Sequence, residues 1–389
     1  MTKLRNLFFL FVLGLMCCKK PYNPPPTSTS KSYLVVEGVI NLSVDSTVIK
    51  ISRTVKLNDS ISFKPVLGAT VYVEGETARY NPALADIYNN GHYWTYDINL
   101  PANERYRLVI TTQEGEQYVS DYVSVKPTPP IDSIGYNVKD GNVNLYVNTH
   151  DPANNTRYYL WDYEETWQFH AKYPSYFYLD PNTNSITARP PQTQVYTCFS
   201  NDVSSHILVS STEALSRDLV YQAPLTQIPL TSEKVENKYS ILVRQCAVSK
   251  EAYQFYQTLL KNTEQLGSIF DAQPSQITGN IHNINDKTEP VIGYVIATNV
   301  QTKRVYVKHA DLPGNVLPIY PYDCTQDSAL YSNKEHYNDV QNILVNPPVT
   351  YIPTIGIYSD GLLIGFMYST KECADCTLRG TVTAPWWWQ

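Results

Sequence analysis

The segments YLVVEGVI at residues 33–40 and STVIKISRTV at residues 46–55 decide the fold class of the first part of this chain. Both are rich in Val and Ile, whose branched side chains favour extended strands, and a short polar segment divides them. Further strand patterns follow at residues 65–74, 92–100 and 105–125, with little helical periodicity between them. Short strands at this spacing predict a β-sandwich of the Ig-like type over residues 33–126.

A second β-rich domain is predicted over residues 127–389, beginning at a proline-rich boundary. Asp140-Gly141 marks a hairpin turn, and residues 157–169 and 238–248 are strong strand candidates. One helix is expected near residues 250–266, with Ser249 as its N-cap and Gly267 as its stop. The whole chain is therefore predicted to be all-β dominated, with two β-sandwich domains. The second is expected to carry an inserted helix and long loops, at residues 174–191 and 313–346.

The first 17 residues are typical of a signal peptide. Lys3 and Arg5 precede a short apolar run at residues 7–16, too short for the ~20 residues that span a bilayer. The adjacent Cys17 and Cys18 end this run and favour a lipoprotein signal, in which the cysteine at the cut site is acylated. Cys18 is the better lipid carrier, because Leu15 then stands three positions before the cut. The alternative is an ordinary secretory signal with incidental cysteines.

Residues 18–32 form a tether between this predicted anchor and the first strand. The stretch PYNPPPTSTSKS cannot build a core, and its prolines favour an extended chain of ~3.1 Å per residue. Such a segment would lift the folded part some tens of ångströms off the lipid.

Composition excludes several classes of protein. Of the 389 residues, 43% are apolar, which is sufficient for sizeable cores and argues against a disordered chain. A formal charge of −6 argues against nucleic acid as a partner. The 32 tyrosines, against 10 phenylalanines, suit half-exposed strand faces.

The cysteines that follow the lipid site are odd in number. They are Cys198, Cys246, Cys324, Cys373 and Cys376. An exported protein lives where disulfides persist, so Cys324 is expected to pair with Cys373 or Cys376. The CxxC spacing of the last two leaves a redox pair or half a zinc site as alternatives, although no second CxxC accompanies it. Cys246 lies in an apolar strand pattern and is expected to be a buried core residue.

Other candidate sites are weak, and no cofactor or metal is predicted. The loop THDPANNT at residues 149–156 is rich in oxygen ligands, but its composition is also that of a turn, which is the favoured interpretation. Glu164 and Glu165 adjoin in a strand, so their side chains should point to opposite faces. No nucleophile, base and oxyanion donor assemble from the motifs, which predicts a protein that is not an enzyme.

Aromatic residues are the candidates for a binding surface. A stacking platform for a sugar or a peptide requires several of them to be exposed together, and the candidates are Tyr158, Tyr159, Trp161, Trp167, Trp386, Trp387 and Trp388. The favoured alternative for the terminal tryptophans is that one or two indoles anchor the end of the chain.

Several long segments in order resemble one family. They are the lipoprotein signal with its PYNP tether, YLVVEGVIN, PVLGATVYVEGE, SDYVSVKPTPPIDSI, NTHDPANNTRYYLWDYEETW, SKEAYQFYQTLLKNTEQLGSIFDAQPSQITGNIHN and CADCTLRGT before the aromatic terminus. Together they resemble the domain of unknown function 4249 family, outer-membrane lipoproteins of Bacteroidota. The resemblance implies a cell-envelope lipoprotein, encoded near TonB-dependent transporters, with no assigned activity. Lys19-Lys20 replaces the acidic run used for surface export, so the anchored protein is expected to face the periplasm.

Three hypotheses follow. The first is a non-enzymatic accessory or interaction module, held to the outer membrane by Cys18, with an outer-membrane transporter as its expected partner. The second is a glycan- or peptide-binding protein that uses the aromatic surface. The third, a hydrolase or other enzyme, has no motif in its favour.

Overall fold

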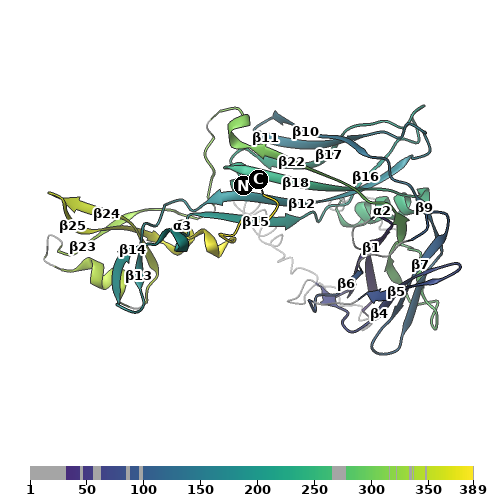
Figure 1. The fold of residues 1–389 in the computed structure, drawn as a ribbon, viewed down its shortest axis with the longest axis horizontal. Coiled ribbons are helices and arrows are strands. Elements are labelled where there is room, and N and C mark those ends of the chain that lie inside the picture. Colours follow the sequence, from purple (N-terminus) through teal and green to yellow (C-terminus); the bar gives the residue numbers. More distant parts are fainter. Residues whose placement is uncertain are drawn as a thin grey trace, which may run out of the picture.

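The molecule is elongated and dominated by β-strands, which confirms the predicted all-β class (Figure 1). The computed structural model describes residues 32–43, 47–55, 63–84, 88–95, 100–264, 277–314, 316–320, 322–332, 335, 337–346 and 348–388. It has three parts, which we call the N-terminal domain, the central body and the distal lobe. The lobe extends the body along the long axis, and the N-terminal domain lies beside the other end of the body. The predicted signal peptide and Cys18, with nearly all of the tether, lie outside the described residues.

The N-terminal domain consists of two layers of strands around one core. Leu34 and Ile51 face this core from one layer, and Val71, Leu108 and Ile110 face it from the other; all are fully or almost fully buried. Buried residues alternate with more exposed ones along residues 70–75, 92–95 and 117–120, as expected of strands with one face on a core. The strands are β1 (Leu34–Asn41), β2 (Thr47–Arg53), β3 (Lys64–Pro65), β4 (Thr70–Gly75), β5 (Arg79–Leu84), β6 (His92–Thr95), β7 (Arg105–Thr111), β8 (Gln117–Ser120) and β9 (Val123–Lys126).

Three short strands from much later in the chain complete this domain. They are β19 (Ile281–Asn283), β20 (Val291–Gly293) and β21 (Ile296–Thr298). β20 and β21 pair in parallel with β1, β21 also pairs with β9, and β19 pairs with β8. Gly293 permits the close approach to β1, because a Cβ there would lie 2.3 Å from the Val36 carbonyl oxygen. The assignment of all residues after 126 to a second domain is therefore wrong for this segment.

The central body packs two antiparallel sheets on one core. The first sheet has the order β10-β11-β17, and the second has the order β15-β12-β18-β22 with β16 also on β12. Their facing side chains form the largest apolar cluster of the described residues, with Val143 and Ile228 meeting Trp161, Ile241 and Val243. The strands are β10 (Ile131–Lys139), β11 (Asn142–Thr149), β12 (Tyr158–His170), β15 (Thr197–Val203), β16 (Leu208–Ser211), β17 (Val220–Pro229), β18 (Lys238–Ala247) and β22 (Gln301–Lys308).

The predicted hairpin and helix of the second part are both present. Asp140 and Gly141 have positive φ angles of 52° and 75° and join β10 to β11. Helix α2 spans Lys250–Thr263, and the Ser249 hydroxyl accepts a hydrogen bond from the Ala252 N–H at 3.2 Å, as expected of an N-cap. The predicted stop at Gly267 lies outside the described residues.

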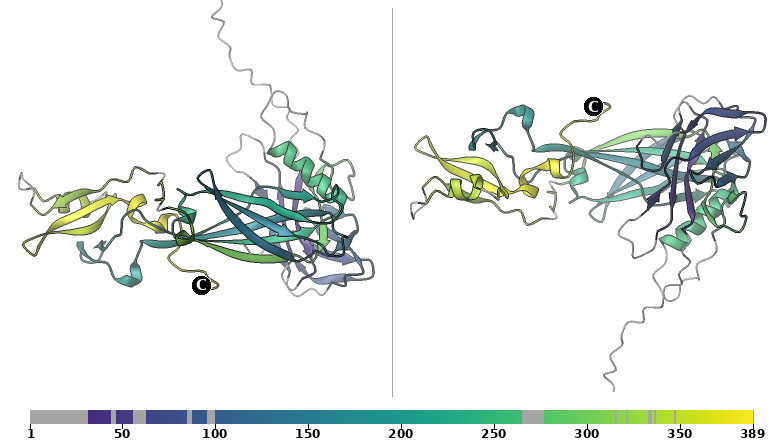
Figure 2. Two further views of the ribbon diagram at one scale, coloured as in Figure 1. Left: turned by 90° about the horizontal axis from the view of Figure 1, so that it is seen from above. Right: turned by 90° about the horizontal axis from the view of Figure 1, so that it is seen from below.

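The distal lobe projects from the end of the central body (Figures 1 and 2). It is built from the two segments that were expected to be long loops, together with residues 351–376. Its elements are β13 (Phe177–Asp180), β14 (Ser185–Ala188), β23 (Asp327–Leu330), the π-helix η4 (Val340–Val345), β24 (Tyr351–Ser359), β25 (Leu362–Thr370) and α3 (Lys371–Ala374). The short 3₁₀ turns of the chain are η1 (Pro191–Thr193), η2 (Glu233–Val235), η3 (His309–Asp311) and η5 (Cys376–Leu378). The second domain is thus a body with a separate lobe rather than one sandwich with loops.

Candidate functional site

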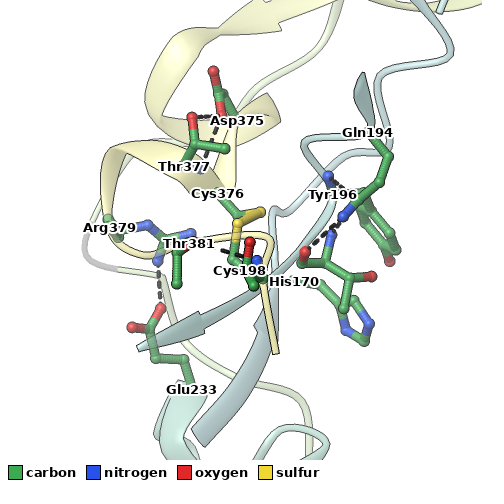
Figure 3. The surroundings of a disulfide bond; sticks show 12 residues. His170, Gln194, Tyr196, Cys198, Glu233, Asp375, Cys376, Thr377, Arg379 and Thr381 are labelled. Carbon is green, nitrogen blue, oxygen red and sulfur yellow. Dashed lines mark hydrogen bonds and ion pairs between the residues drawn. A yellow bond between two sulfur atoms is a disulfide. The ribbon is translucent and has the colours of Figure 1, made fainter. Parts of the chain in front are cut away.

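Two disulfides fix the distal lobe and its junction with the body. Cys324 pairs with Cys373 inside the lobe, and Cys198 on β15 pairs with Cys376 at the junction (Figure 3). The expectation of structural disulfides, with Cys324 bound to one cysteine of the CxxC pair, is confirmed. Each cysteine of the CxxC motif is joined to a distant cysteine, so the two do not form a redox pair with one another. The sequence prediction did not name Cys198 as a partner.

Cys246 is buried and unpaired among the described cysteines. Burial raises the pKa of its thiol far above the ordinary value, which keeps it protonated and unreactive. The prediction of a core cysteine is confirmed.

After Cys376 the chain crosses the outer face of the body sheet. We call residues 376–388 the C-terminal strap. Phe199 and Thr381 exchange backbone hydrogen bonds of 2.7 and 2.8 Å, which joins the strap to β15. Further along, the Trp388 ring meets Phe199 and Tyr306 edge-on, with centroids 5.3 and 6.0 Å apart. The strap is therefore held at both of its ends.

Arg379 is the polar centre of this junction. Its guanidinium binds the Glu233 carboxylate and lies over the rings of Phe169, Tyr320 and Tyr322, at 4.9, 5.9 and 5.4 Å from the centroids (Figure 3 shows the contact with Glu233). Its Nε and one terminal nitrogen are buried with no hydrogen-bond partner among the described residues. The aromatic rings stabilise the part of the buried guanidinium that makes no hydrogen bond. Arg379, which belongs to the strap, therefore contacts both the body and the lobe.

The tryptophans do not form one exposed face. Trp161 and Trp167 are buried in the core of the body, and Trp161 Nε1 donates to Gln245 Oε1 at 2.8 Å. The prediction that they belong to a surface for ligands is wrong. Every second residue of β12 points into the core, and both tryptophans stand at such inward positions. Only Trp386 is fully in solvent, with 96% of its surface exposed, while Trp387 and Trp388 are half-buried. Trp387 packs on the Arg304 guanidinium at 3.5 Å, which fits the anchoring alternative for these two indoles.

A small pocket lies where the strap crosses the body sheet. It has a volume of about 250 Å³, and its walls include Glu164, Thr166, Asn201, Asp202 and Trp387. The combination of one aromatic wall with carboxylate and amide oxygens suits a neutral polyol or sugar.

A larger cleft of about 560 Å³ separates the N-terminal domain from the body, beside the start of α2. Two of the three cationic side chains in its walls have partners within the chain. Lys250 Nζ lies 2.5 Å from a Glu213 carboxylate oxygen, and Arg157 donates to the carbonyl oxygens of Thr212 and Leu215 at 3.3 and 3.2 Å. These contacts indicate a structural junction between the two domains.

The loop that was considered for calcium is a turn. The Asp151 carboxylate accepts hydrogen bonds from the N–H groups of Ala153, Asn155 and Thr156 at 2.8–2.9 Å. These donors hold the pKa of Asp151 below its ordinary value, against the opposing effect of burial. Within the described ranges, no group of three or more His, Cys, Asp or Glu side chains is placed to hold a metal ion.

Glu164 and Glu165 point to opposite faces of β12, as predicted. Glu164 lies outside with Arg244, whereas Glu165 is buried and lies 2.5 Å from Lys234 Nζ and 2.6 Å from the Tyr239 hydroxyl. Burial raises the pKa of Tyr239 well above its ordinary value, so it stays a hydrogen-bond donor to this carboxylate. The arrangement stabilises the core and leaves no free base or nucleophile at this position.

The distal lobe exposes an apolar hairpin at its end. β24 and β25 are joined by Asp360 and Gly361, whose φ angles are 51° and 81°, and we call residues 355–364 the apolar tip. Five of its side chains are exposed by 36–71%, namely Ile355, Tyr358, Leu362, Leu363 and Ile364. An exposed apolar cluster on a projecting element is typical of an interaction surface. The sequence pattern alone does not identify the apolar tip, because β24 and β25 are recognisable only in the folded sheet.

Comparison with known proteins gives one informative match. The family model "Domain of unknown function (DUF4249)" matches residues 19–304, which is most of the chain. The chain belongs to the DUF4249 family. Strands β23, β24 and β25 lie after the matched range of this DUF4249 protein.

The remaining comparisons carry no functional information. No curated protein matches the chain. Among solved structures, it is similar at 11% identity and a TM-score of 0.16 to "Putative membrane anchored protein from Corynebacterium diphtheriae". That match covers 56% of this chain and 55% of the other, so the chain spans about half the length of that protein. In the described part of the chain, no helix has the length and apolar character needed to cross a membrane.

Proposed function

We propose that this protein is a cell-envelope lipoprotein that works as a non-enzymatic accessory module, anchored by Cys18 and binding a protein partner through its distal lobe. The observation that carries the proposal is the apolar tip, which stands at the end of the molecule away from the N-terminal domain (Figure 1). An anchor before the first domain and an apolar surface on the last lobe suit a tethered binding protein.

The proposed partner is an outer-membrane transporter of the TonB-dependent class. This expectation derives from the family resemblance and from the predicted lipid anchor. The tether of residues 18–32 would reach about 45 Å if fully extended at ~3.1 Å per residue. An anchored molecule with that reach can approach neighbouring proteins in the same membrane and face the periplasm.

Crosslinking and mass spectrometry on intact outer membranes, with the natively acylated protein, test the proposal. We expect crosslinks to concentrate on one envelope protein and to involve the distal lobe. The double variant L362D/L363D should lower their yield at least tenfold, because it places two charges in the apolar tip. Leu215→Asp is the matched control, since Leu215 is 50% exposed in the central body.

The proposal fails if the labelled protein gives no crosslinks to any envelope protein. It also fails if L215D and L362D/L363D lower the yield equally, since the lobe would then have no special role. Replacing Cys18 with Ser should release the protein from the membrane fraction, and retention there would contradict the anchor.

The pocket under the strap favours a second candidate function, the capture of glycans or peptides. Its aromatic lining residues are Trp387 and Phe199, and the neighbouring Trp386 is exposed and able to stack on a ligand. Calorimetric titration with soluble oligosaccharides such as maltoheptaose tests this candidate. Binding should disappear in Trp387→Ala and persist in Tyr221→Ala, which removes an aromatic ring that is 73% exposed elsewhere. Absence of binding across such a panel would remove the glycan form of the hypothesis.

A further inference from the structure

Strand β24 has a free edge in the apolar tip. The strand order of its sheet is β23-β25-β24, so β24 lies at one side. Its first half is covered by the segment before β13, where the Tyr176 N–H donates to the Thr354 carbonyl oxygen at 2.9 Å. Beyond Thr354, the described residues provide backbone partners for β24 only from β25.

This free edge lacks two of the features that keep exposed strands from pairing, namely outward charges and prolines, while its register with β25 shifts between Pro353 and Gly356 and between Ile357 and Tyr358. Natural edge strands are protected by charged side chains, prolines or bulges directed outward. Pro353 precedes the free part of the strand, and Asp360 is the single charged residue between Thr354 and Ile364. Asp360 stands in the turn itself rather than along the edge. The backbone groups of residues 355–359 that point away from β25 are therefore open to another strand.

Apolar side chains cover both faces of the tip. Tyr358 is opposite Leu363 in the register, and both lie on the face of Gly356, where an added Cβ would contact them at 2.9 and 3.0 Å. The neighbouring Leu362 points to the other face, because successive residues of a strand alternate. A binding partner must therefore cover two faces as well as the edge.

We propose that the free edge of β24 binds an extended apolar segment of the partner protein as an added strand, with the tip seated in a cleft of that partner. Backbone hydrogen bonds along residues 355–359 would supply affinity, and pockets for Tyr358, Leu362 and Leu363 would supply specificity. The inference rests on the proposed function and deepens it by naming the surface and the chemistry of the segment it binds.

Two other occupants fit the geometry less well. A second copy could pair edge to edge with β24, but that arrangement would leave the apolar side chains on both faces in water. Lipid could cover both faces, but it cannot satisfy the unpaired backbone groups of the edge. A strand from a protein cleft meets both requirements.

Hydrogen–deuterium exchange on the protein purified with its crosslinked partner tests the inference. We expect those amides of residues 355–359 that point away from β25 to exchange at least tenfold more slowly in the complex than in the free protein. The turn at Asp140-Gly141 joins another exposed hairpin and is the internal control, whose exchange should not change. Ile355→Lys, which places a charge beside the edge, should weaken the complex at least tenfold without changing the melting temperature.

The outcomes separate this inference from the proposed function. Unchanged exchange at residues 355–359 in an intact complex overturns strand addition and leaves the accessory role standing. Protection that grows with protein concentration and needs no partner overturns it in favour of a second copy. Protection that phosphatidylethanolamine vesicles produce alone overturns it in favour of lipid. Failure to recover any partner removes the proposed function itself.

Discussion

The central body and the distal lobe differ in what holds them together. Among the described residues, the body buries 21 residues in one cluster, from Ile131 to Cys376, whereas the lobe buries four, which are Ala329, Val340, Leu344 and Phe366. The lobe compensates with the Cys324–Cys373 disulfide and is joined to the body by the Cys198–Cys376 disulfide. Small units with little apolar burial commonly depend on such covalent links.

The difference shows why the lobe can expose apolar side chains. A unit stabilised by disulfides does not need every Leu, Ile and Tyr in its core. The side chains that remain, such as Leu362 and Tyr358, are then available for a partner. In the body, inward and outward positions alternate along β12, and its tryptophans are buried.

Removal of both disulfides should have the largest effect and should separate the two regions. The quadruple Cys-to-Ser variant of Cys198, Cys324, Cys373 and Cys376 is expected to unfold the lobe and leave the body folded. Closing the 49-residue loop of Cys324–Cys373 alone is worth about 4 kcal/mol of chain entropy. Limited proteolysis should cut within residues 313–375 while the central body resists. Simultaneous loss of both regions would contradict the comparison.

A matched pair of core deletions sharpens the same comparison. Phe366 in the lobe and Phe169 in the body are both fully buried. Phe366→Ala and Phe169→Ala should each cost about 3 to 5 kcal/mol, from lost burial and the cavity left behind. Among the described residues of the lobe, only three others are buried in this cluster, so Phe366→Ala should produce a separate early transition in calorimetry. A single shared transition in both variants would show that lobe and body unfold as one unit.

The elements that could be predicted from the sequence are the locally determined ones. Val- and Ile-rich runs gave the strands, Asp140-Gly141 gave a hairpin, and Ser249 gave a helix start, because each depends on neighbouring residues alone. The pairing of β20 and β21 with β1 could not be predicted, since the partners are more than 250 residues apart. Such pairing follows from three-dimensional closure of the sheet.

The candidate sites also divide into features that neighbouring residues determine and features that depend on the three-dimensional fold. Cys324 was recognised as a disulfide cysteine, whereas Cys198 was not assigned, because connectivity cannot be deduced from spacing. The apolar tip lay in a segment without a strand assignment, and exposure of Leu362 depends on which sheet it joins. The lipid anchor at Cys18, the transporter and the absence of enzymatic activity stay predictions.

Substitution of Arg379 at the junction between the two regions should have a moderate effect on stability. Arg379→Met removes the ion pair with Glu233 and the contacts with three rings, and should cost about 1 to 2 kcal/mol. The cost is limited because methionine also removes two buried nitrogens without partners. Arg379→Lys keeps the charge but loses the planar stacking, so denaturant unfolding should place it between methionine and the native residue. A lysine variant equal to the native protein would show that charge alone matters.

The smallest expected effect is the contribution of His150, on the surface of the body, to the pH dependence of stability. Its Nδ1 lies 2.7 Å from Asp132, and this hydrogen bond together with the negative charge raises the pKa of His150 above its ordinary value of about 6.5. A group whose pKa is raised by folding stabilises the native state fully below the unfolded pKa. That contribution is lost as pH rises through the folded value. Because both side chains are more than a third exposed, the change in stability should be a few tenths of a kcal/mol at most. Asp132→Asn should return the pKa toward the ordinary value in an NMR titration, whereas Asp140→Asn, which removes a charge at the opposite end of the β10–β11 hairpin, should not. An unchanged titration in Asp132→Asn would show that this contact is absent in solution.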